Sequence, residues 1–254
     1  MELGLAGKVV LVTGASTAIG RATALAFAEE KAHVAVGYHT NLQAAEETVA
    51  MAERRGAQAI AWRLDLGRPD SLPSAVEHAR DRLGPVDVLV NNAVRWPDWP
   101  EPGELFETAP PERFTTSVTA NLVGPYLLAR AVLADMRANG WGRIVNVSTG
   151  LVEDGFPGNV SYVAAKAGLH GLTRVMSREL ASAGILTNVV MPGFTPAGKP
   201  MPQHLLDKAG EAAATKRVSH PDDAARMIVY LCSAANTNTT GEAIRTDGHF
   251  LTPG

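Results

Sequence analysis

The stretch Lys8-Val-Val-Leu-Val-Thr-Gly-Ala-Ser-Thr-Ala-Ile-Gly20 combines the features that predict how this chain folds. Residues 8–13 form a short, mainly apolar run, which is typical of a buried strand in a parallel sheet. Gly14 permits a sharp turn after that run. The alanine-rich segment 21–31 then favours a helix. The stretch therefore predicts a strand, a glycine turn and a helix in immediate succession.

The turn between this strand and this helix has the composition of a phosphate-binding loop. Glycine allows a close approach of the backbone, and a helix N-terminus offers free N–H groups to a pyrophosphate. The spacing is Thr-Gly-x-x-x-x-x-Gly, longer than the Gly-x-Gly-x-x-Gly form, and an unliganded strand–helix connection is the alternative. The residues expected to contact a dinucleotide here are Gly14, Ser16, Thr17, Ile19 and Gly20.

Strand-like and helix-like patterns alternate along the rest of the chain. This alternation predicts an α/β fold: one doubly wound, Rossmann-type parallel sheet of about seven strands with helices on both faces. Nothing resembles a linker, so residues 1–254 are expected to form a single domain. The expected strands are residues 8–13, 33–37, 58–64, 86–90, 143–147, 185–190 and 243–246. The expected helices are 21–31, 41–55, 71–83, 113–139 (with a kink at 124–125), 162–181 and 222–232.

Composition narrows the functional classes. A formal charge of −3 gives no electrostatic argument for nucleic acid or for an anionic membrane. The single cysteine, Cys232, excludes an internal disulfide framework and a thiol metal cluster, and no metal site is expected. No signal segment and no stretch of ~20 apolar residues is evident, so a cytoplasmic protein is expected.

The end of the second expected strand indicates which dinucleotide binds. NAD enzymes often carry an acidic residue there for the ribose 2′-hydroxyl, but this chain has His39, Thr40 and Asn41. These side chains could hydrogen-bond a 2′-phosphate, which favours NADP over NAD. Asp65, followed by Leu66, ends the third strand and is expected beside the adenine, although a turn-initiating aspartate is the alternative.

Tyr162 and Lys166 lie four residues apart in a predicted helix, so their side chains share one face. A nearby ammonium favours the phenolate form, which predicts a lowered tyrosine pKa. Such a pair could exchange a proton with an alcohol or a ketone. An ordinary surface contact between the two side chains is the alternative.

In this order the motifs resemble those of the short-chain dehydrogenase/reductase family, over essentially the whole chain. The resemblance implies hydride transfer between a nicotinamide and a ketone or alcohol, with an NADPH-dependent ketoreductase as the expected enzyme. It also implies a homotetramer or homodimer and a small-molecule substrate. The residues that carry it are Thr13–Gly20, Asp65, Asn91-Asn92-Ala93, Asn121, Tyr162, Lys166, Pro192-Gly193, Thr240-Gly241 and Asp247-Gly248.

The family's catalytic spacing selects Asn121, Thr149, Tyr162 and Lys166. A threonine therefore stands where the family usually has a serine, with Ser148 beside it as the rival. The resemblance further implies cofactor contacts for Asn92, Ala93, Tyr162, Lys166, Pro192, Gly193 and Thr195. Three departures from the family pattern are Ala18 and His249 in place of glycines, and an early position for Thr195.

Two segments are expected to form the substrate pocket. The tryptophan- and proline-rich stretch 95–103 follows the fourth strand and would suit an aromatic or polyketide-like ketone, unless its tryptophans pack on the domain. Segment 194–218, expected to be a mobile helical lid, would complete the pocket together with Asp154 and Phe156. A nucleotide-binding regulatory or redox-sensing protein and an epimerase or dehydratase on the same scaffold are the alternative functions.

Overall fold

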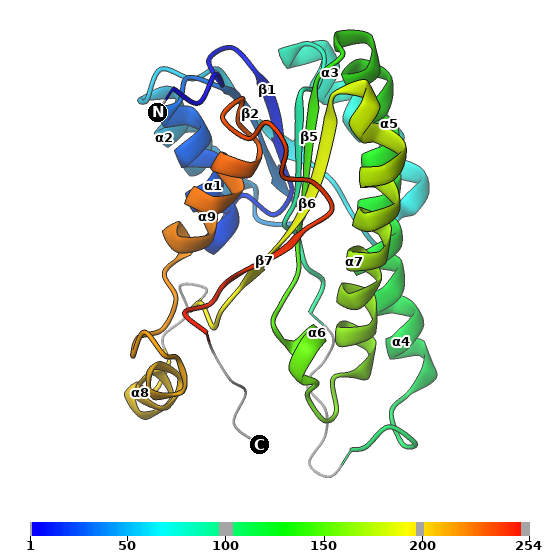
Figure 1. Ribbon diagram of the computed structural model, residues 1–254, viewed down its shortest axis with the longest axis vertical. Helices are drawn as coiled ribbons and strands as arrows, with labels where there is room; N and C mark the ends of the chain where they lie inside the picture. Colours follow the sequence, from blue (N-terminus) through cyan, green and yellow to red (C-terminus); the bar gives the residue numbers. More distant parts are fainter. Residues whose placement is uncertain (1, 97–103, 197–200, 250–254) are drawn as a thin grey trace.

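The structure is a computed structural model that describes residues 2–96, 104–196 and 201–249. It contains one sheet of seven parallel strands in the order β3-β2-β1-β4-β5-β6-β7 (Figure 1). The predicted α/β doubly wound fold is confirmed. The strands are β1 (Val9–Val12), β2 (His33–Tyr38), β3 (Ala59–Arg63), β4 (Val88–Asn91), β5 (Gly142–Val147), β6 (Ile185–Pro192) and β7 (Ala243–Thr246).

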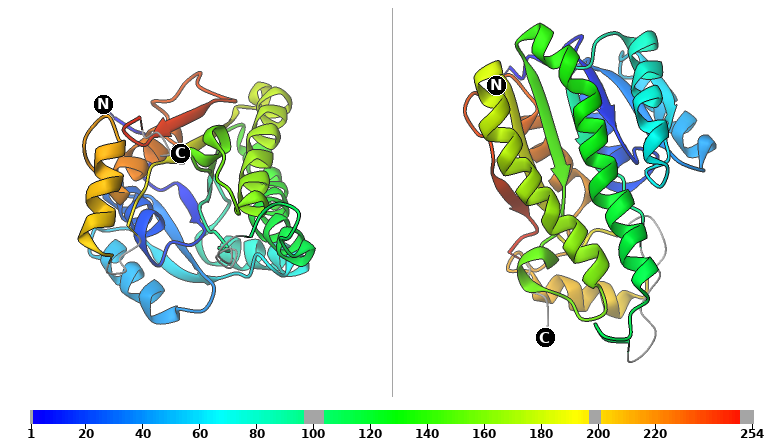
Figure 2. Two further views of the ribbon diagram at one scale, coloured as in Figure 1. Left: turned by 90° about the horizontal axis from the view of Figure 1, so that it is seen from below. Right: turned by 90° about the vertical axis from the view of Figure 1, so that its right-hand side faces the viewer.

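Helices cover both faces of the sheet. On one face lie α3 (Leu72–Leu83), α5 (Gly124–Asn139) and α7 (Val160–Leu180), which the right-hand view of Figure 2 shows in front of the sheet. Their apolar side chains are buried against the strands. On the other face α1 (Ala18–Glu29), α2 (Leu42–Glu53) and α9 (Pro221–Leu231) do the same. The inner strands β1, β4, β5 and β6 are almost wholly buried because they are sandwiched between these two layers, whereas the edge strands β3 and β7 are only partly buried.

The long helix was expected to kink at Gly124-Pro125. In the structure, α4 (Pro111–Val118) passes through a π-helical turn, Thr119–Val123, just before that pair and continues as α5. Pro125 has no N–H to donate to the carbonyl of Asn121 four residues earlier, which favours such a local widening over an ordinary α turn.

The combined helix Pro111–Asn139 is also long and apolar enough, by length and composition, to cross a membrane. From the sequence, no stretch was expected to be long and apolar enough for this. Its buried residues, among them Leu128, Val132 and Met136, belong to the hydrophobic core, and a core helix of a globular domain meets the same criterion.

The segments beyond the carboxyl ends of the strands were predicted least well. A short helix, α6 (Leu151–Asp154), interrupts the connection after β5 and was not anticipated. The expected lid contains α8 (Gln203–Ala212), while residues 197–200 lie outside the described residues. Because all strands are parallel, the motifs at the ends of β1, β4, β5 and β6 meet at this one edge.

Candidate active site

The chain at the end of β5 contacts α7 at Lys166 and Tyr162, the pair that the four-residue spacing indicated. Lys166 Nζ donates a hydrogen bond of 2.7 Å to the carbonyl of Val147, the last residue of β5. Two residues further on, the Thr149 side chain lies beside the Tyr162 hydroxyl and acts on its pKa as a hydrogen-bonding neighbour. Tyr162 and Lys166 are both buried, at 5% and 3% exposure, one turn apart on α7. The structure thus brings Thr149, Tyr162 and Lys166 together.

Burial dominates the electrostatics of this group. It lowers the pKa of Lys166 to about 8. It also raises the pKa of Tyr162 well above its usual value, and the hydrogen bond with Thr149 only partly opposes this. The expectation that Lys166 lowers the tyrosine pKa is therefore wrong, and Lys166 Nζ lies 6.0 Å from the centre of the Tyr162 ring. Tyr162 keeps its proton at neutral pH.

Ser148 and Thr149 face different neighbours, as adjacent residues of an extended segment do. The buried Ser148 hydroxyl lies 2.9 Å from His170 Nε2 and donates to the Lys166 carbonyl at 3.3 Å. Thr149 is partly exposed and contacts Tyr162 and the N–H of Leu151.

Asn121 lies in the π turn and ties the helix to the segment after β4. Its Oδ1 accepts from the Arg95 N–H, and its Nδ2 donates to the Arg95 carbonyl, both at 2.9 Å. This clamp holds the residue next to Trp96. The Trp96 ring stacks on Tyr162 with ring centres 5.0 Å apart, although the Trp96 side chain is mostly exposed. The predicted residues 97–103 of this wall lie outside the described residues.

The glycine turn forms a cradle that side chains would fill. A Cβ atom on Gly20 would lie 2.1 Å from the Gly14 carbonyl oxygen, and Gly14 itself has a φ of +64°. Ala18 adopts a φ of +45°, a left-handed conformation that explains why glycine is usual at that place. Such a close-approach cradle at a helix N-terminus fits a pyrophosphate.

Thr13, which the sequence analysis treated only as part of the motif, connects the ends of two strands. Its hydroxyl oxygen accepts hydrogen bonds from the N–H groups of Asn92 and Ala93 at 2.9 and 2.8 Å. Asn92 Nδ2 in turn donates to the Thr13 carbonyl at 2.9 Å. The two cofactor segments are therefore fixed to each other across β1 and β4.

The residues expected at the 2′-position are only partly available. His39 and Thr40 are exposed at the end of β2, and His39 Nε2 lies 3.4 Å from Asp65 Oδ2. Asn41, by contrast, caps α2 by accepting from the Ala44 N–H, so its oxygen is already used. Leu66 packs in the core, and only its backbone could meet an adenine.

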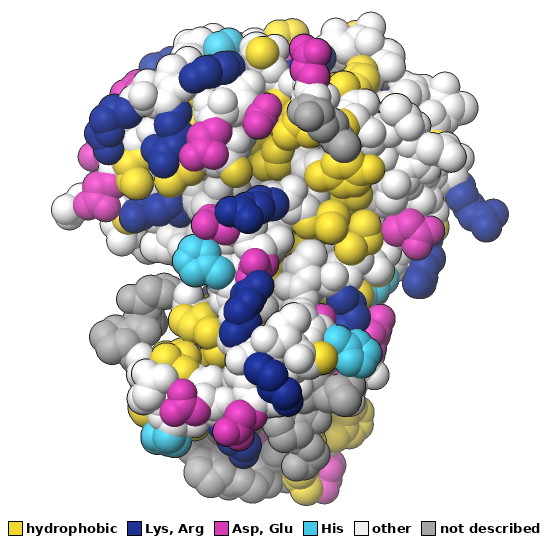
Figure 3. All heavy atoms as spheres, turned by 60° about the vertical axis from the view of Figure 1, so that its left-hand side comes forward, with side chains coloured by type: hydrophobic (Ala, Val, Ile, Leu, Met, Phe, Trp, Pro, Cys, Tyr) yellow, Lys and Arg dark blue, Asp and Glu magenta, His cyan; other side chains and the backbone are white. Residues whose placement is uncertain are grey.

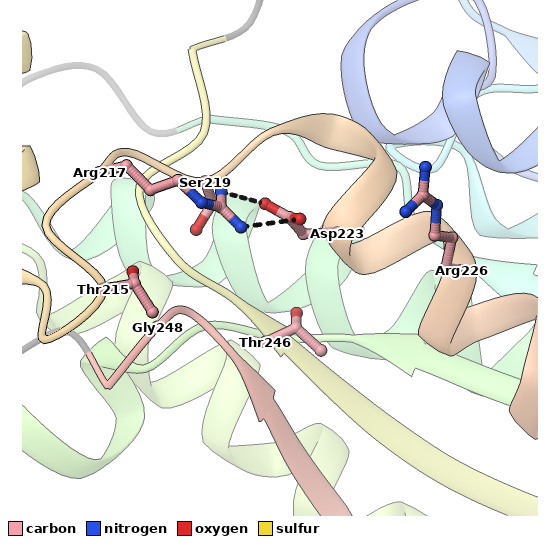
Figure 4. Close-up of a pocket in the computed structure, with 7 residues that line it drawn as sticks. All are labelled: Thr215, Arg217, Ser219, Asp223, Arg226, Thr246 and Gly248. Carbon is pink, nitrogen blue, oxygen red and sulfur yellow. Dashed lines mark hydrogen bonds and ion pairs between the residues drawn. The ribbon is translucent and has the colours of Figure 1, made fainter.

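The segment after β6 is shaped by close packing. A Cβ atom on Gly193 would lie 2.5 Å from Ser219 Oγ, and the Thr195 hydroxyl donates to the Gly193 carbonyl at 2.9 Å. Thr195 therefore supports its own turn. Near it, Thr215, Arg217, Ser219, Asp223, Arg226, Thr246 and Gly248 line a polar cavity of about 230 Å³, in which Arg217 is paired with Asp223 (Figure 4).

Two further findings bear on the class of site. On the face shown in Figure 3, Lys and Arg side chains alternate with Asp and Glu and form no extended basic patch. Within the described ranges, no group of His, Cys, Asp and Glu side chains is arranged to hold a metal ion.

The comparisons with known proteins agree with this geometry. The family model for short chain dehydrogenases matches residues 8–205. The chain belongs to the short-chain dehydrogenase/reductase family and is an oxidoreductase of that family, whose members use a nicotinamide cofactor.

Several relatives are similar over nearly their full length. The 3-oxoacyl-[acyl-carrier-protein] reductase FabG of Thermotoga maritima is 34% identical, covering 97% of this chain and 99% of that protein. The corresponding reductase of Synechocystis is also 34% identical, over 97% and 98%. Among solved structures, the reductase LugOII, which catalyses keto-reduction in lugdunomycin biosynthesis, is 35% identical with a TM-score of 0.89, over 98% and 99%. Acetoin dehydrogenase YohF of Salmonella typhimurium is 32% identical with a TM-score of 0.86, over 96% and 95%.

Proposed function

We propose that the protein is an NADPH-dependent ketoreductase. The observation that carries this proposal is an arrangement of three residues: Tyr162 and Lys166 are buried one helical turn apart on α7, and Thr149 lies beside the Tyr162 hydroxyl. A tyrosine that keeps its proton at neutral pH is suited to donate it, which is what ketone reduction requires. The similarity to proteins named as 3-oxoacyl reductases and to the keto-reducing LugOII also supports ketone reduction.

In the proposed mechanism each residue has a separate task. The nicotinamide supplies the hydride when it is bound. Thr149 donates a hydrogen bond that polarises the substrate carbonyl, and Tyr162 gives its proton to the oxygen as negative charge develops there. Lys166, whose ammonium is anchored on the carbonyl of Val147, holds the nicotinamide ribose. The main-chain carbonyl of Asn121 accepts no hydrogen bond from Pro125, which has no N–H. This carbonyl holds the water through which a proton returns from solvent.

The cofactor contacts proposed are those that line the cradle and the neighbouring strand ends. The turn Gly14–Gly20 receives the pyrophosphate, His39 and Thr40 the 2′-phosphate, and Asp65 the adenine. Asn92, Ala93, Pro192 and Gly193 lie along the nicotinamide half. Asn41 and Thr195, whose side-chain oxygens are engaged locally, contribute through their backbone.

The preference for NADPH is testable at His39. In His39→Asp we expect the KM for NADPH to rise by about tenfold or more, because a carboxylate repels the 2′-phosphate. The KM for NADH should stay the same or fall, since an acid at this strand end can accept from the ribose 2′-hydroxyl. Initial rates with each nucleotide measure this. An unchanged ratio of the two KM values would contradict a role for His39.

The assignment of Thr149 is testable against its neighbour. Thr149→Ala is expected to lower kcat by about 10²-fold or more, since one donor to the developing oxyanion is lost. Ser148→Ala removes a hydroxyl of the same segment that does not contact Tyr162, and it should lower kcat by less than about tenfold. Steady-state kinetics of the two variants decide the matter, and a larger loss in Ser148→Ala would reverse the assignment.

The proposed substrate is a planar aromatic or polyketide-like ketone. The exposed indole of Trp96 covers the ring of Tyr162 and, with Arg95, Arg113 and Ser117, lines a cavity of about 320 Å³. A flat ring system could stack on this indole while its carbonyl reaches Thr149. The name of LugOII places it in the biosynthesis of lugdunomycin, which is compatible with such a substrate.

The experiment that tests the function is NADPH oxidation with a panel of quinones, decalones, small ketones and a 3-oxoacyl thioester. Turnover with a ketone is expected. Tight NADPH binding with no oxidation would favour a redox-sensing protein, and product formation without net cofactor consumption would favour an epimerase or dehydratase. As in the family generally, we propose a homotetramer or homodimer, located in the cytoplasm.

A further inference from the structure

His170 continues the face of α7 that carries the proposed catalytic pair. Tyr162, Lys166 and His170 follow one another at four-residue intervals, so one helix turn separates each from the next. Three successive residues at the end of β5 dock on this face. Val147 contacts the Lys166 ammonium, Ser148 contacts His170, and Thr149 contacts Tyr162.

The Ser148 hydroxyl has one proton and two hydrogen-bonding neighbours. It donates that proton to the Lys166 carbonyl at 3.3 Å. With the imidazole proton on Nε2, the 2.9 Å contact with His170 completes a chain in which Nε2–H donates to Ser148 Oγ while the hydroxyl donates to Lys166. The pair joins the strand residue before Thr149 to the backbone of Lys166.

The surroundings keep the imidazole in place and neutral. His170 is only 8% exposed, and burial together with the nearby Arg174 lowers its pKa, while Glu153 acts in the opposite sense. A neutral ring can contact Ser148 through Nε2 in either tautomer, as donor or as acceptor.

We propose that His170 is a positioning residue which, through Ser148, holds the Thr149 hydroxyl against Tyr162. Without the imidazole, the Ser148 hydroxyl loses one of its two partners, and the segment after β5 gains freedom at the residue adjacent to Thr149. A hydroxyl misplaced by a small distance polarises a carbonyl poorly. This inference rests on the proposed function of Thr149.

The kinetic test compares His170→Leu with His170→Gln. Leucine fills the site without a donor, and kcat is expected to fall about 3–10-fold while the KM for NADPH changes by less than about twofold. Glutamine, whose Nε2 reaches a similar place, should restore most of kcat. His78→Leu, at an exposed position of α3, is the matched control and should leave kcat unchanged. A folded His170→Leu variant with wild-type kcat would overturn the proposal.

A double-mutant cycle separates positioning from general stabilisation. If His170 acts through Thr149, His170→Leu should cost little further kcat in a Thr149→Ala background. Multiplicative losses would mean that the two residues act independently and would refute the proposal. If His170→Leu does not fold, Ser148→Ala removes the same bond from the other side and should give the same non-additivity.

Crystal structures of the wild type and of a folded variant give a readout that needs no turnover. The Thr149 hydroxyl is expected to turn away from Tyr162 in His170→Leu. An unchanged Thr149–Tyr162 hydrogen bond would count against the proposal. An absence of ketone reduction by the wild type would count against the proposed function alone.

Discussion

Replacing Tyr162 by phenylalanine is expected to lower kcat for ketone reduction by about 10²–10⁴-fold, the range over which a positioned general acid accelerates a reaction. The change removes only the hydroxyl that lies beside Thr149. The phenyl ring can still stack on Trp96, so the packing of the site should survive. The steady-state rate of NADPH oxidation measures the effect.

The binding of NADPH distinguishes loss of chemistry from loss of structure. Tyr162→Phe should bind NADPH with a dissociation constant close to that of the wild type, because the phosphate cradle lies at the other end of the cofactor site. Tyr126→Phe, on the exposed face of α5, is the matched control and should retain full activity. Turnover that survives Tyr162→Phe would eliminate Tyr162 as the proton donor.

The strand pattern could be predicted from the sequence because burial on both faces leaves a simple signature. Continuous apolar runs such as Val9–Val12 are constrained by two helical layers at once, and they identified the strands to within about two residues. The π turn at Thr119–Val123 could not be predicted in the same way. It depends on how one missing N–H is accommodated within a helix that continues on both sides.

The contacts of the site were less predictable than its residue types. The four-residue spacing indicated that Tyr162 and Lys166 share a face, but not that burial would outweigh their attraction and raise the tyrosine pKa. The position of His170 could have been noticed, because it lies four residues after Lys166 on the same helix face. The family motif does not include this residue. The Trp96–Tyr162 contact had no local signal, because it joins segments far apart in the chain.

Gly20→Ala is expected to destabilise the protein by about 3 kcal/mol, at the upper end of what overpacking usually costs, and to abolish measurable NADPH binding. The added methyl would lie 2.1 Å from the Gly14 carbonyl oxygen and 2.6 Å from Asn92 Nδ2. Neither neighbour can yield easily, since Gly14 is held in the turn and Asn92 Nδ2 already donates to the Thr13 carbonyl at 2.9 Å. The turn must open, and its N–H groups then no longer converge on a pyrophosphate.

Gly171→Ala is the matched control for this change. Gly171 lies within α7, and a Cβ atom there would meet nothing within 4 Å. Because alanine is the better helix former, the free energy of unfolding should rise by about 0.5–1 kcal/mol with NADPH affinity unchanged. Denaturant unfolding and nucleotide titration of both variants test the pair. Equal stability of Gly20→Ala and the wild type, with NADPH affinity retained, would show that close backbone approach at this turn is not what shapes the cofactor site.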